Sequence, residues 1–315
     1  MAFEELLGND RLKKNLAESL ARGHISHFYL ISGPAGSGKR TLAGILAEAI
    51  LCEGSRKGCG NCVHCRKMRS GSHPDFITVE DPEHKNVAVK IVRQIRDDMF
   101  IRPNEAEHKI YLFPQELGLE GQNALLKILE EPPAYGVFLL LTDNPDKLLP
   151  TVRSRCTELK MQSLDGRILW DQLHRDFPEA GEADLQAAIY RSGGFLGQAR
   201  ELLEAGDQLP PQTEQFVDAF SRKDPMLLTQ VLVPMEKWKR DALADILQSW
   251  LEILESALTS RSGLEAVSSQ ARQIALQRTA GEIYQALAVL RKAREYTLSN
   301  VSPAAVCGWL IWALR

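Results

Sequence analysis

The sequence predicts an α/β plus all-α fold, in which a parallel sheet covered by helices is followed by a purely helical region. Up to about residue 162, short apolar runs alternate with segments of helical periodicity, which is typical of parallel strands joined by helices. A glycine-rich loop separates the first apolar run from the first helical segment, as in phosphate-binding loops. Beyond residue 162 the strand signals cease, and apolar residues recur at spacings of three or four.

Each element of the first half follows from a local pattern. Apolar runs predict strands at 28–31, 75–80, 108–113, 137–142 and 157–161. A helix is expected directly after the glycine-rich loop, and another at 91–100, where Val92, Ile95 and Met99 share one face. A further helix at 123–131 ends at Pro132 and Pro133.

We expect three domains. A phosphate-loop domain would occupy 1–162, with a cysteine-rich module at about 52–70, followed by a small helical domain at 163–205 and a second helical domain at 206–315. Gly193 and Gly194 mark a turn between helices of the second domain. In the third domain, stripes at spacings of three or four predict the core of a helix bundle. These stripes consist of Leu243, Leu247, Trp250, Leu254, Ile283, Leu287, Leu290, Val306, Leu310 and Ala313.

The composition excludes several classes of protein. With 44% hydrophobic residues in 315, the chain is expected to fold rather than to stay disordered. Its net charge of −3 gives no overall attraction to nucleic acid or to anionic membranes, so such contacts must be local or shared with partners. The first five residues carry two acids and no long apolar run, and the apolar segment 301–314 is too short to span a bilayer. We therefore expect a cytoplasmic protein without membrane contact.

Four of the six cysteines lie close together in the sequence. Cys52, Cys59, Cys62 and Cys65 fall within 14 residues, a density that does not suit a disulfide framework in a cytoplasmic chain. Four thiolates bind Zn²⁺ in a closed tetrahedral site, so the pattern predicts a structural zinc site without a catalytic role. The alternative is a reduced, metal-free surface loop.

The residues around this module are mostly basic. A four-thiolate zinc site has a formal charge of about −2. Five nearby cations would offset it, namely Arg56, Lys57, Arg66, Lys67 and Arg69. His64 and His73 are expected to be solvated, because four sulfur ligands are already available. Cys156 and Cys307 stand apart and are expected in the core.

The glycine-rich loop predicts a nucleotide site. The segment 33–39 reads GPAGSGK, follows a predicted strand and opens a predicted helix, which is the context that the motif requires. Its backbone N–H groups and the helix N-terminus can surround phosphates, while the lysine reaches the outer ones. The candidate ligands are Gly33, Gly36, Gly38 and Lys39, with Arg40 and Thr41 beside them.

Two positions depart from what a nucleotide hydrolase needs. The residue after Lys39 should carry a hydroxyl that binds Mg²⁺, but Arg40 stands there, and Thr41 is rotated by about 100° around the helix. An acid is required at the end of the third strand, where the chain instead reads Pro114-Gln115. Glu116 follows and remains a candidate. The sequence predicts that ATP or ADP binds with little or no hydrolysis.

Three further segments carry a family resemblance. Residues 123–133 read NALLKILEEPP, residues 149–156 read LPTVRSRC, and the four-cysteine insertion directly follows the phosphate-loop helix. Together they resemble the delta-prime family of bacterial DNA polymerase III subunits, which are clamp-loader proteins of the AAA+ class. The resemblance covers about residues 1–200 and is weak beyond. It implies an AAA+ domain, a small helical lid, and a C-terminal helical collar that joins subunits into a ring.

The resemblance also implies roles for particular residues. Arg155 matches an arginine finger that enters the ATP site of a neighbouring subunit and stabilises charge on the transferred phosphoryl group. From the residues alone, Arg153 and Arg155 would instead pair with surface acids. Thr142 occupies the place of a polar phosphate sensor. Gly197 stands where the lid of the motor subunits carries an arginine.

The implied function is that of a clamp-loader subunit in the DNA polymerase III holoenzyme. It would supply Arg155 to an adjacent ATPase, without intrinsic catalysis, and help to load the sliding clamp during DNA replication. Its partners would be the gamma/tau and delta subunits, the clamp, and primed DNA reached through the complex.

Two alternatives stay open at this point. The chain would be an active gamma/tau-like ATPase motor if Lys39 and Glu116 served hydrolysis, or the basic cysteine module would bind DNA directly. Polymerase chemistry would belong to the holoenzyme, because no set of acids is arranged for two-metal nucleotidyl transfer.

Overall fold

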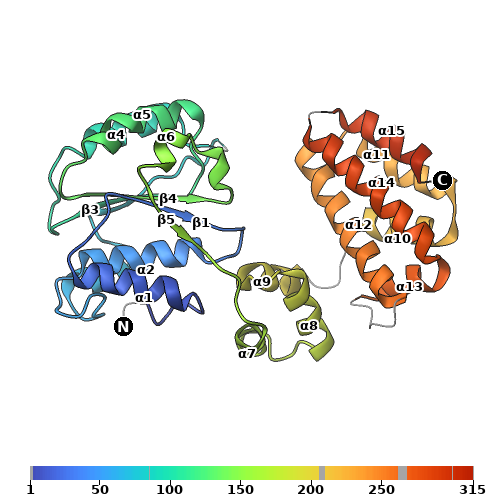
Figure 1. The fold of residues 1–315 in the computed structure, drawn as a ribbon, viewed down its shortest axis with the longest axis horizontal. Coiled ribbons are helices and arrows are strands. Elements are labelled where there is room, and N and C mark those ends of the chain that lie inside the picture. Colours follow the sequence, from blue (N-terminus) through green and yellow to red (C-terminus); the bar gives the residue numbers. More distant parts are fainter. Residues whose placement is uncertain (1–2, 85, 206–209, 262–267, 300, 315) are drawn as a thin grey trace. The chain divides into compact units, whose positions relative to one another are not determined.

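A computed structural model describes residues 3–84, 86–205, 210–261, 268–299 and 301–314. The chain divides into two compact units, Met1–Leu202 and Leu203–Arg315 (Figure 1). The first unit contains α1 (Asp10–Ala21), β1 (Phe28–Ser32), α2 (Lys39–Leu51), α3 (Val63–Arg69), β2 (Phe76–Thr78), α4 (Val89–Asp98), β3 (Lys109–Phe113), α5 (Leu119–Glu130), β4 (Gly136–Thr142), the 3₁₀ turn η1 (Pro145–Lys147), α6 (Pro150–Arg153), β5 (Thr157–Lys160), α7 (Gly166–Asp176) and α8 (Glu182–Arg191), and most of α9 (Leu196–Ala205). The second contains α10 (Pro211–Arg222), α11 (Pro225–Met235), α12 (Arg240–Arg261), α13 (Ser269–Gln277), α14 (Ala280–Leu298) and α15 (Pro303–Ala313).

The five strands of the described residues form one parallel sheet in the order β2-β3-β4-β1-β5. All residues of β1, β3 and β4 are buried, which explains why their sequences are mostly apolar rather than alternating. Phe28 of β1 lies opposite Phe138 of β4, and their rings stack with centroids 4.5 Å apart. The predicted parallel sheet is confirmed.

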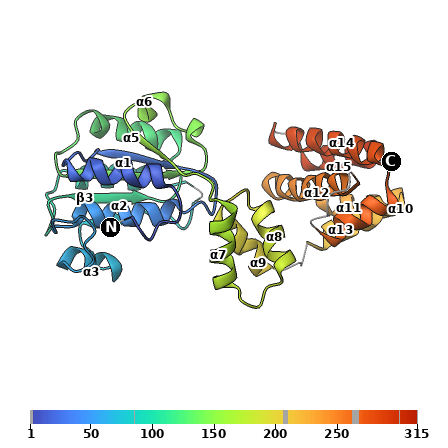
Figure 2. The same ribbon diagram turned by 60° about the horizontal axis from the view of Figure 1, so that its bottom comes forward.

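Helices cover both faces of the sheet (Figures 1 and 2). Tyr29 and Ile31 of β1 pack with α1 and α2, whereas Phe28 and Leu30 pack with α4, α5 and α6 on the opposite face. Because the strands are parallel, their carboxyl ends meet at one edge of the sheet. The loops after β1, β2, β3 and β4 therefore converge on the same region.

Several element boundaries differ from the predicted ones. The strand β2 is shorter than the predicted 75–80, and α5 begins at Leu119 rather than at 123. The helices α1 and α3 have no counterpart in the prediction. Helix α1 is amphipathic and buries Leu16 and Leu20 against the sheet, so its stability comes from this contact with distant strands.

The segment α7–α9 belongs to the first unit up to Leu202. Gly193 and Gly194, with φ of 58° and 91°, form the turn that the sequence predicts between helices. Gly194 accepts a hydrogen bond from the backbone N–H of Leu164 at 2.8 Å, which ties this turn to the segment after β5. Whether α7–α9 form a separate domain from the sheet stays a prediction.

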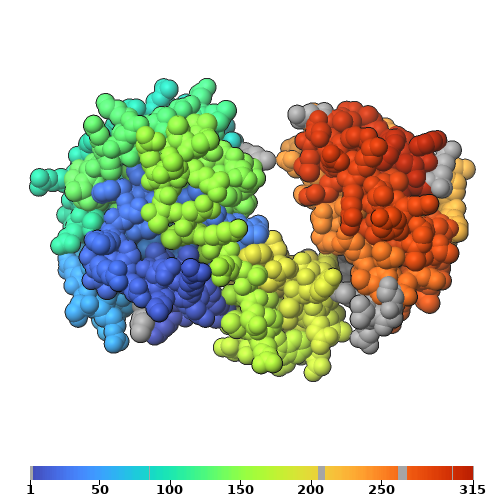
Figure 3. All heavy atoms as spheres, viewed as in Figure 1, coloured from blue at the N-terminus to red at the C-terminus, as the bar shows by residue number. Residues whose placement is uncertain are grey.

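The second unit is a helix bundle with its own core, and side chains fill the space between its ribbons (Figure 3). Trp250 is fully buried and stacks on Phe216 with ring centroids 4.0 Å apart. Nine of the ten predicted stripe residues are buried, while Ala313 is half-buried. No helix in the described ranges is long and apolar enough to cross a membrane.

Candidate functional site

The phosphate loop connects β1 to α2. Gly36 and Gly38 have φ of 69° and 88°, in the left-handed region that favours glycine, and α2 begins at Lys39 directly after the second of them. The Ser37 hydroxyl is buried and finds no hydrogen-bond partner among the described residues. This hydroxyl lies within the loop that precedes the N-terminus of α2, where free backbone N–H groups can bind a phosphate.

Lys39 is held at the carboxyl edge of the sheet. Its Nζ donates to the carbonyl oxygens of Gly33 and Pro34, each at 2.7 Å, and forms an ion pair with Asp143 Oδ1 at 2.6 Å. Asp143 directly follows β4, which is the neighbour of β1 in the sheet. The loop lysine is thus bound by three oxygen atoms that phosphate oxygens would have to replace.

A cavity of about 650 Å³ opens beside this loop. Its lining includes Ser37, Lys39 and Arg40 of the phosphate loop and helix α2, together with apolar side chains such as Leu164 and Phe195. Such a volume is within the usual range of about 300–1,000 Å³ for ligand pockets. The combination of a cationic loop and an apolar wall suits a nucleotide.

Helix α9 rests directly on the phosphate loop. The backbone N–H of Gly197 donates to the Gly36 carbonyl oxygen at 2.9 Å. A Cβ atom at Gly197 would lie 2.6 Å from Gly36 Cα, and one at Gly36 would lie 2.4 Å from the Gln198 nitrogen. Both positions therefore require glycine, and neither has room for a side chain.

The residues at the metal-binding positions have other contacts. Arg40 donates from Nη2 to Glu80 Oε1 at 2.8 Å. Gln115 is bound to the loop after β2, because its Oε1 accepts from the Asp81 N–H at 2.6 Å and its Nε2 donates to the Asp81 and His84 carbonyls at 2.9 and 3.1 Å. Glu116 accepts two hydrogen bonds from Lys147 Nζ, both at 2.9 Å.

The structure brings most of the predicted nucleotide ligands together. Gly36, Gly38, Lys39, Arg40 and Thr41 line the cavity, whereas Gly33 contributes its carbonyl to Lys39. Thr142 is not part of this lining within the described residues: its hydroxyl donates to the Asn144 carbonyl at 2.9 Å.

Sequence reasoning missed Asp143 and Glu80, which bind Lys39 and Arg40. Asp143 directly follows β4, and Glu80 lies two residues after β2, so both stand near the carboxyl ends of parallel strands. Functional side chains gather at this edge of a parallel sheet, and this rule could have identified both acids from the sequence.

Arg155 lies two residues beyond α6 and is half-exposed. Its Nη2 donates to Glu130 Oε1 at 3.1 Å and its Nη1 to the Thr151 carbonyl at 2.9 Å. Arg153 pairs with Asp146 at 2.8 Å and with Glu158 at 3.3 Å. In the isolated chain both arginines pair with surface acids, and neither is among the described residues that line the phosphate-loop cavity.

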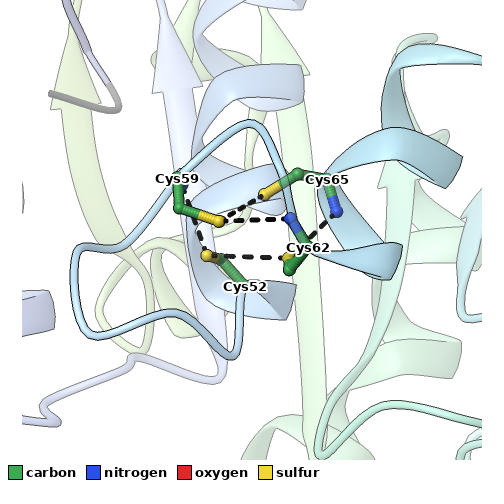
Figure 4. A group of neighbouring side chains, drawn as sticks. All are labelled: Cys52, Cys59, Cys62 and Cys65. Carbon is green, nitrogen blue, oxygen red and sulfur yellow. Dashed lines mark hydrogen bonds between the residues drawn. The ribbon is translucent and has the colours of Figure 1, made fainter.

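The four predicted metal ligands form one cluster (Figure 4). Cys52 and Cys59 lie on the loop after α2, and Cys62 and Cys65 at the start of α3; their sulfur atoms all lie within 4.8 Å of one another. The Cys59–Cys65 and Cys52–Cys62 sulfur pairs are each 4.0 Å apart. Four sulfurs around zinc at about 2.3 Å are separated by about 3.8 Å. The cluster therefore fits a tetrahedral ion closely.

Backbone N–H groups point at the sulfur atoms. The N–H groups of Cys59, Cys62 and Cys65 donate to the sulfurs of Cys52, Cys59 and Cys62, each at 3.4 Å. Hydrogen bonds from the Asn61 and Cys62 backbones lower the pKa of the Cys59 thiol to about 6. This favours the thiolate, which is the form that binds metal.

The prediction that His64 and His73 are solvated is wrong. Both are buried, and His64 Nδ1 lies 2.8 Å from His73 Nε2. The Asp75 N–H donates to His73 Nδ1 at 3.1 Å, so His73 carries its proton on Nε2 and donates to His64, which in turn donates from Nε2 to Glu53 at 3.0 Å. Burial lowers the pKa of His73, which favours its neutral form. This series of hydrogen bonds connects the cysteine module to the start of β2.

The five basic residues of the module are only partly available to a ligand. Lys57 donates to the Cys52 carbonyl at 2.8 Å, Lys67 pairs with Glu105, and Arg69 pairs with Glu48 at 3.5 Å. Cys307 is buried as predicted, and Cys156 is half-buried.

Several known proteins are similar to this chain in sequence. The Bacillus subtilis DNA polymerase III subunit tau is 30% identical over 210 residues, which are 64% of this chain and 37% of that protein. The subunit gamma of Buchnera aphidicola subsp. Schizaphis graminum is 28% identical over 252 residues, 76% of this chain and 69% of that protein. A solved structure of a DNA polymerase III gamma subunit-related protein from Thermotoga maritima has a TM-score of 0.47 and 18% identity, covering 95% of this chain and 98% of that one.

The matched region thus spans little more than a third of the tau subunit from Bacillus subtilis. A family model described as DNA polymerase III, delta subunit, matches residues 8–165. This range includes the phosphate loop, the cysteine cluster and Arg155, and it amounts to half of the 315 residues. The chain therefore belongs to the DNA polymerase III delta-subunit family.

Proposed function

We propose that this chain is a delta-prime-type clamp-loader subunit that donates Arg155 to the ATP site of a neighbouring gamma/tau subunit. In this role it works in the cytoplasm with the delta subunit, the sliding clamp and primed DNA. Its own phosphate loop holds ATP or ADP without hydrolysing it.

The observation that supports this most is the set of contacts at the metal-binding positions. Arg40 is bound to Glu80, Gln115 holds the loop after β2, and Glu116 is paired with Lys147. An ATPase needs an acid here to hold Mg²⁺ and position water. The gamma/tau-like alternative relies on Glu116, whose carboxylate accepts two hydrogen bonds from a lysine and is not among the described residues lining the cavity.

Arg155 suits donation to another protein. Its pair with Glu130 is half-exposed, and such pairs contribute only about 0–1 kcal/mol, so the guanidinium can leave it for a phosphate. The carbonyl of Thr151 orients the same group from a residue of α6. A guanidinium placed in this way delivers two parallel donors to phosphate oxygens.

The test is the ATPase activity of a reconstituted clamp loader that contains this chain. Arg155→Ala should lower turnover by about 10³-fold while the complex still assembles. Arg153→Ala is the matched control, because its side chain is equally exposed and ion-paired, and it should leave turnover within about threefold. Unchanged turnover with Arg155→Ala in an intact complex would refute the proposal, as would ATP hydrolysis by the purified chain that is abolished by Lys39→Ala.

We also propose that the four-cysteine cluster holds one structural zinc ion. The sulfur separations and the N–H groups aimed at the thiolates support this. When bound, the ion would fix the loop after α2 to the start of α3.

A further inference from the structure

We infer that the phosphate-loop cavity binds a nucleoside diphosphate or triphosphate without a divalent cation, and that Arg40 supplies the positive charge that Mg²⁺ supplies elsewhere. The inference rests on the static nucleotide site proposed above and specifies its chemistry. It concerns the cavity formed by the phosphate loop, the C-terminal ends of the strands and helix α9.

The cavity has the parts that a nucleotide needs. The lining includes the cations Lys39 and Arg40, and the Ser37 hydroxyl of the same loop is buried without a partner in the described part of the chain. The same lining includes Leu6, Leu164 and Phe195, apolar side chains against which a base can pack.

Magnesium does not fit the groups that are present. This ion requires oxygen ligands in octahedral geometry, and the hydroxyl and carboxylate positions of the motif hold Arg40 and Gln115. Within the described residues, the acids that line the cavity are Glu5 and Asp143. Asp143 is bound to Lys39 Nζ at 2.6 Å, so a cation on its carboxylate would meet the positive charge of that ammonium group.

Arg40 is placed to take over the role of the metal. It occupies the first turn of α2, next to Lys39, and lines the cavity. Its partner Glu80 is about half-exposed and the Arg40 side chain is two-thirds exposed, which makes this ion pair weak enough to exchange for a phosphate. A guanidinium binds two phosphate oxygens at once, as a metal ion between the β- and γ-phosphates does.

The third cation of the lining, Arg200, is already fixed. Arg200 of α9 donates from Nε and Nη2 to Asp176 at 2.9 and 2.6 Å. Its guanidinium is therefore held by a carboxylate and adds positive potential without moving. Lys39 and Arg40 are left to contact the phosphates.

The experiment measures ADP and ATP binding to the purified full-length chain by calorimetry, in a chelator and again in excess Mg²⁺. The dissociation constants should agree within about threefold between the two conditions. Arg40→Ala should weaken binding by about tenfold or more in both, the effect of losing a hydrogen bond to a charged group. Arg40→Lys should keep part of the affinity, because it retains the charge and loses the two parallel donors.

The matched control is Arg222→Ala in the second unit. Arg222 has the same exposure as Arg40, 65% against 67%, and a similar ion pair, 2.7 Å to Asp218 against 2.8 Å to Glu80. It should bind both nucleotides with wild-type affinity. Circular dichroism and thermal melting establish that each variant is folded.

Three results would overturn the inference. These are binding that requires Mg²⁺, no binding by the wild-type chain, or wild-type affinity in folded Arg40→Ala. A failure of the proposed function would be detected by a different experiment. The Arg155→Ala experiment measures hydrolysis in the neighbouring subunit and not binding in this cavity.

Discussion

Asp75 is fully buried at the start of β2 and is surrounded by donors. Its carboxylate accepts from the Asn104 N–H at 2.6 Å, the Asn104 side chain at 3.0 Å, and the N–H groups of Glu105 and Ala106 at 2.8 and 2.9 Å. Burial by itself would raise the pKa of this carboxyl, but the four hydrogen bonds lower it below its usual value. One side chain thus fixes the loop that leads into β3.

Asp75→Asn should lower the free energy of unfolding by about 3 kcal/mol, because the amide turns an NH₂ group toward backbone donors and loses the charge. Asp97→Asn, at an exposed carboxylate, is the control and should change it by less than about 0.5 kcal/mol. Urea denaturation at pH 7 measures both.

The loss of stability caused by Asp75→Asn should depend on pH. Because the folded pKa of Asp75 lies below the unfolded value of about 3.9, its contribution is complete above that value and is lost as the pH falls through the folded pKa. The difference in stability between wild type and Asp75→Asn should therefore shrink below about pH 4. A constant difference down to pH 2 would contradict this account.

At the scale of elements, the cysteine cluster connects a loop to a helix of only seven residues. A helix of this length is not stable by itself in water, since isolated helices need about 12–15 residues. Its start is fixed by Cys62, whose sulfur accepts from the Cys65 N–H at 3.4 Å. We therefore expect α3 to depend on the bound metal.

The purified chain should contain one zinc ion, and Cys62→Ser should lose it together with the protection of α3 amides from hydrogen exchange. Cys156→Ser is the control, because Cys156 lies outside the cluster. The serine hydroxyl can still donate to the Val152 carbonyl, as the thiol does. Elemental analysis and exchange mass spectrometry give the two readings. Full zinc content in Cys62→Ser would exclude that residue as a ligand.

Element by element, the sequence is most informative where a pattern is local. The phosphate loop and the C-x₂-C-x₂-C motif were predicted because their chemistry lies within a few consecutive residues. The Lys39–Asp143 pair and the buried His64–His73 pair were not, because each joins segments that only the fold brings together. Burial of a histidine is decided by its neighbours in space, which periodicity does not reveal.

At the scale of the whole molecule, the two units have separate cores. The core of the second unit contains residues from Phe216 to Leu314, whereas the two cores on the faces of the sheet contain residues from Phe3 to Met161. No described residue belongs to both sets. Each unit therefore has a hydrophobic core of its own, and we expect the two units to unfold independently of each other.

Trp250→Ala tests this independence. Removing this fully buried side chain should cost the second unit about 3–5 kcal/mol and leave the hydroxyl of Thr213 without its indole donor. In exchange mass spectrometry with increasing denaturant, α10–α15 should lose protection earlier while β1, β3 and β4 stay unchanged. Trp312→Ala, at an exposed tryptophan, should change neither. Earlier loss of protection in the strands as well would show that the units unfold together.

The contacts of Gln115 limit how this site can change. A glutamate at that position would keep an oxygen for the Asp81 N–H but would place its other, negatively charged oxygen against two carbonyls that now receive N–H donors. The same glutamate that could bind a metal ion would therefore repel the loop that leads to α4. A serine at position 40 would similarly leave Glu80 without its cation. If the site binds nucleotide without hydrolysis, as proposed, engineering hydrolysis would require the supporting loop to be redesigned together with the acid.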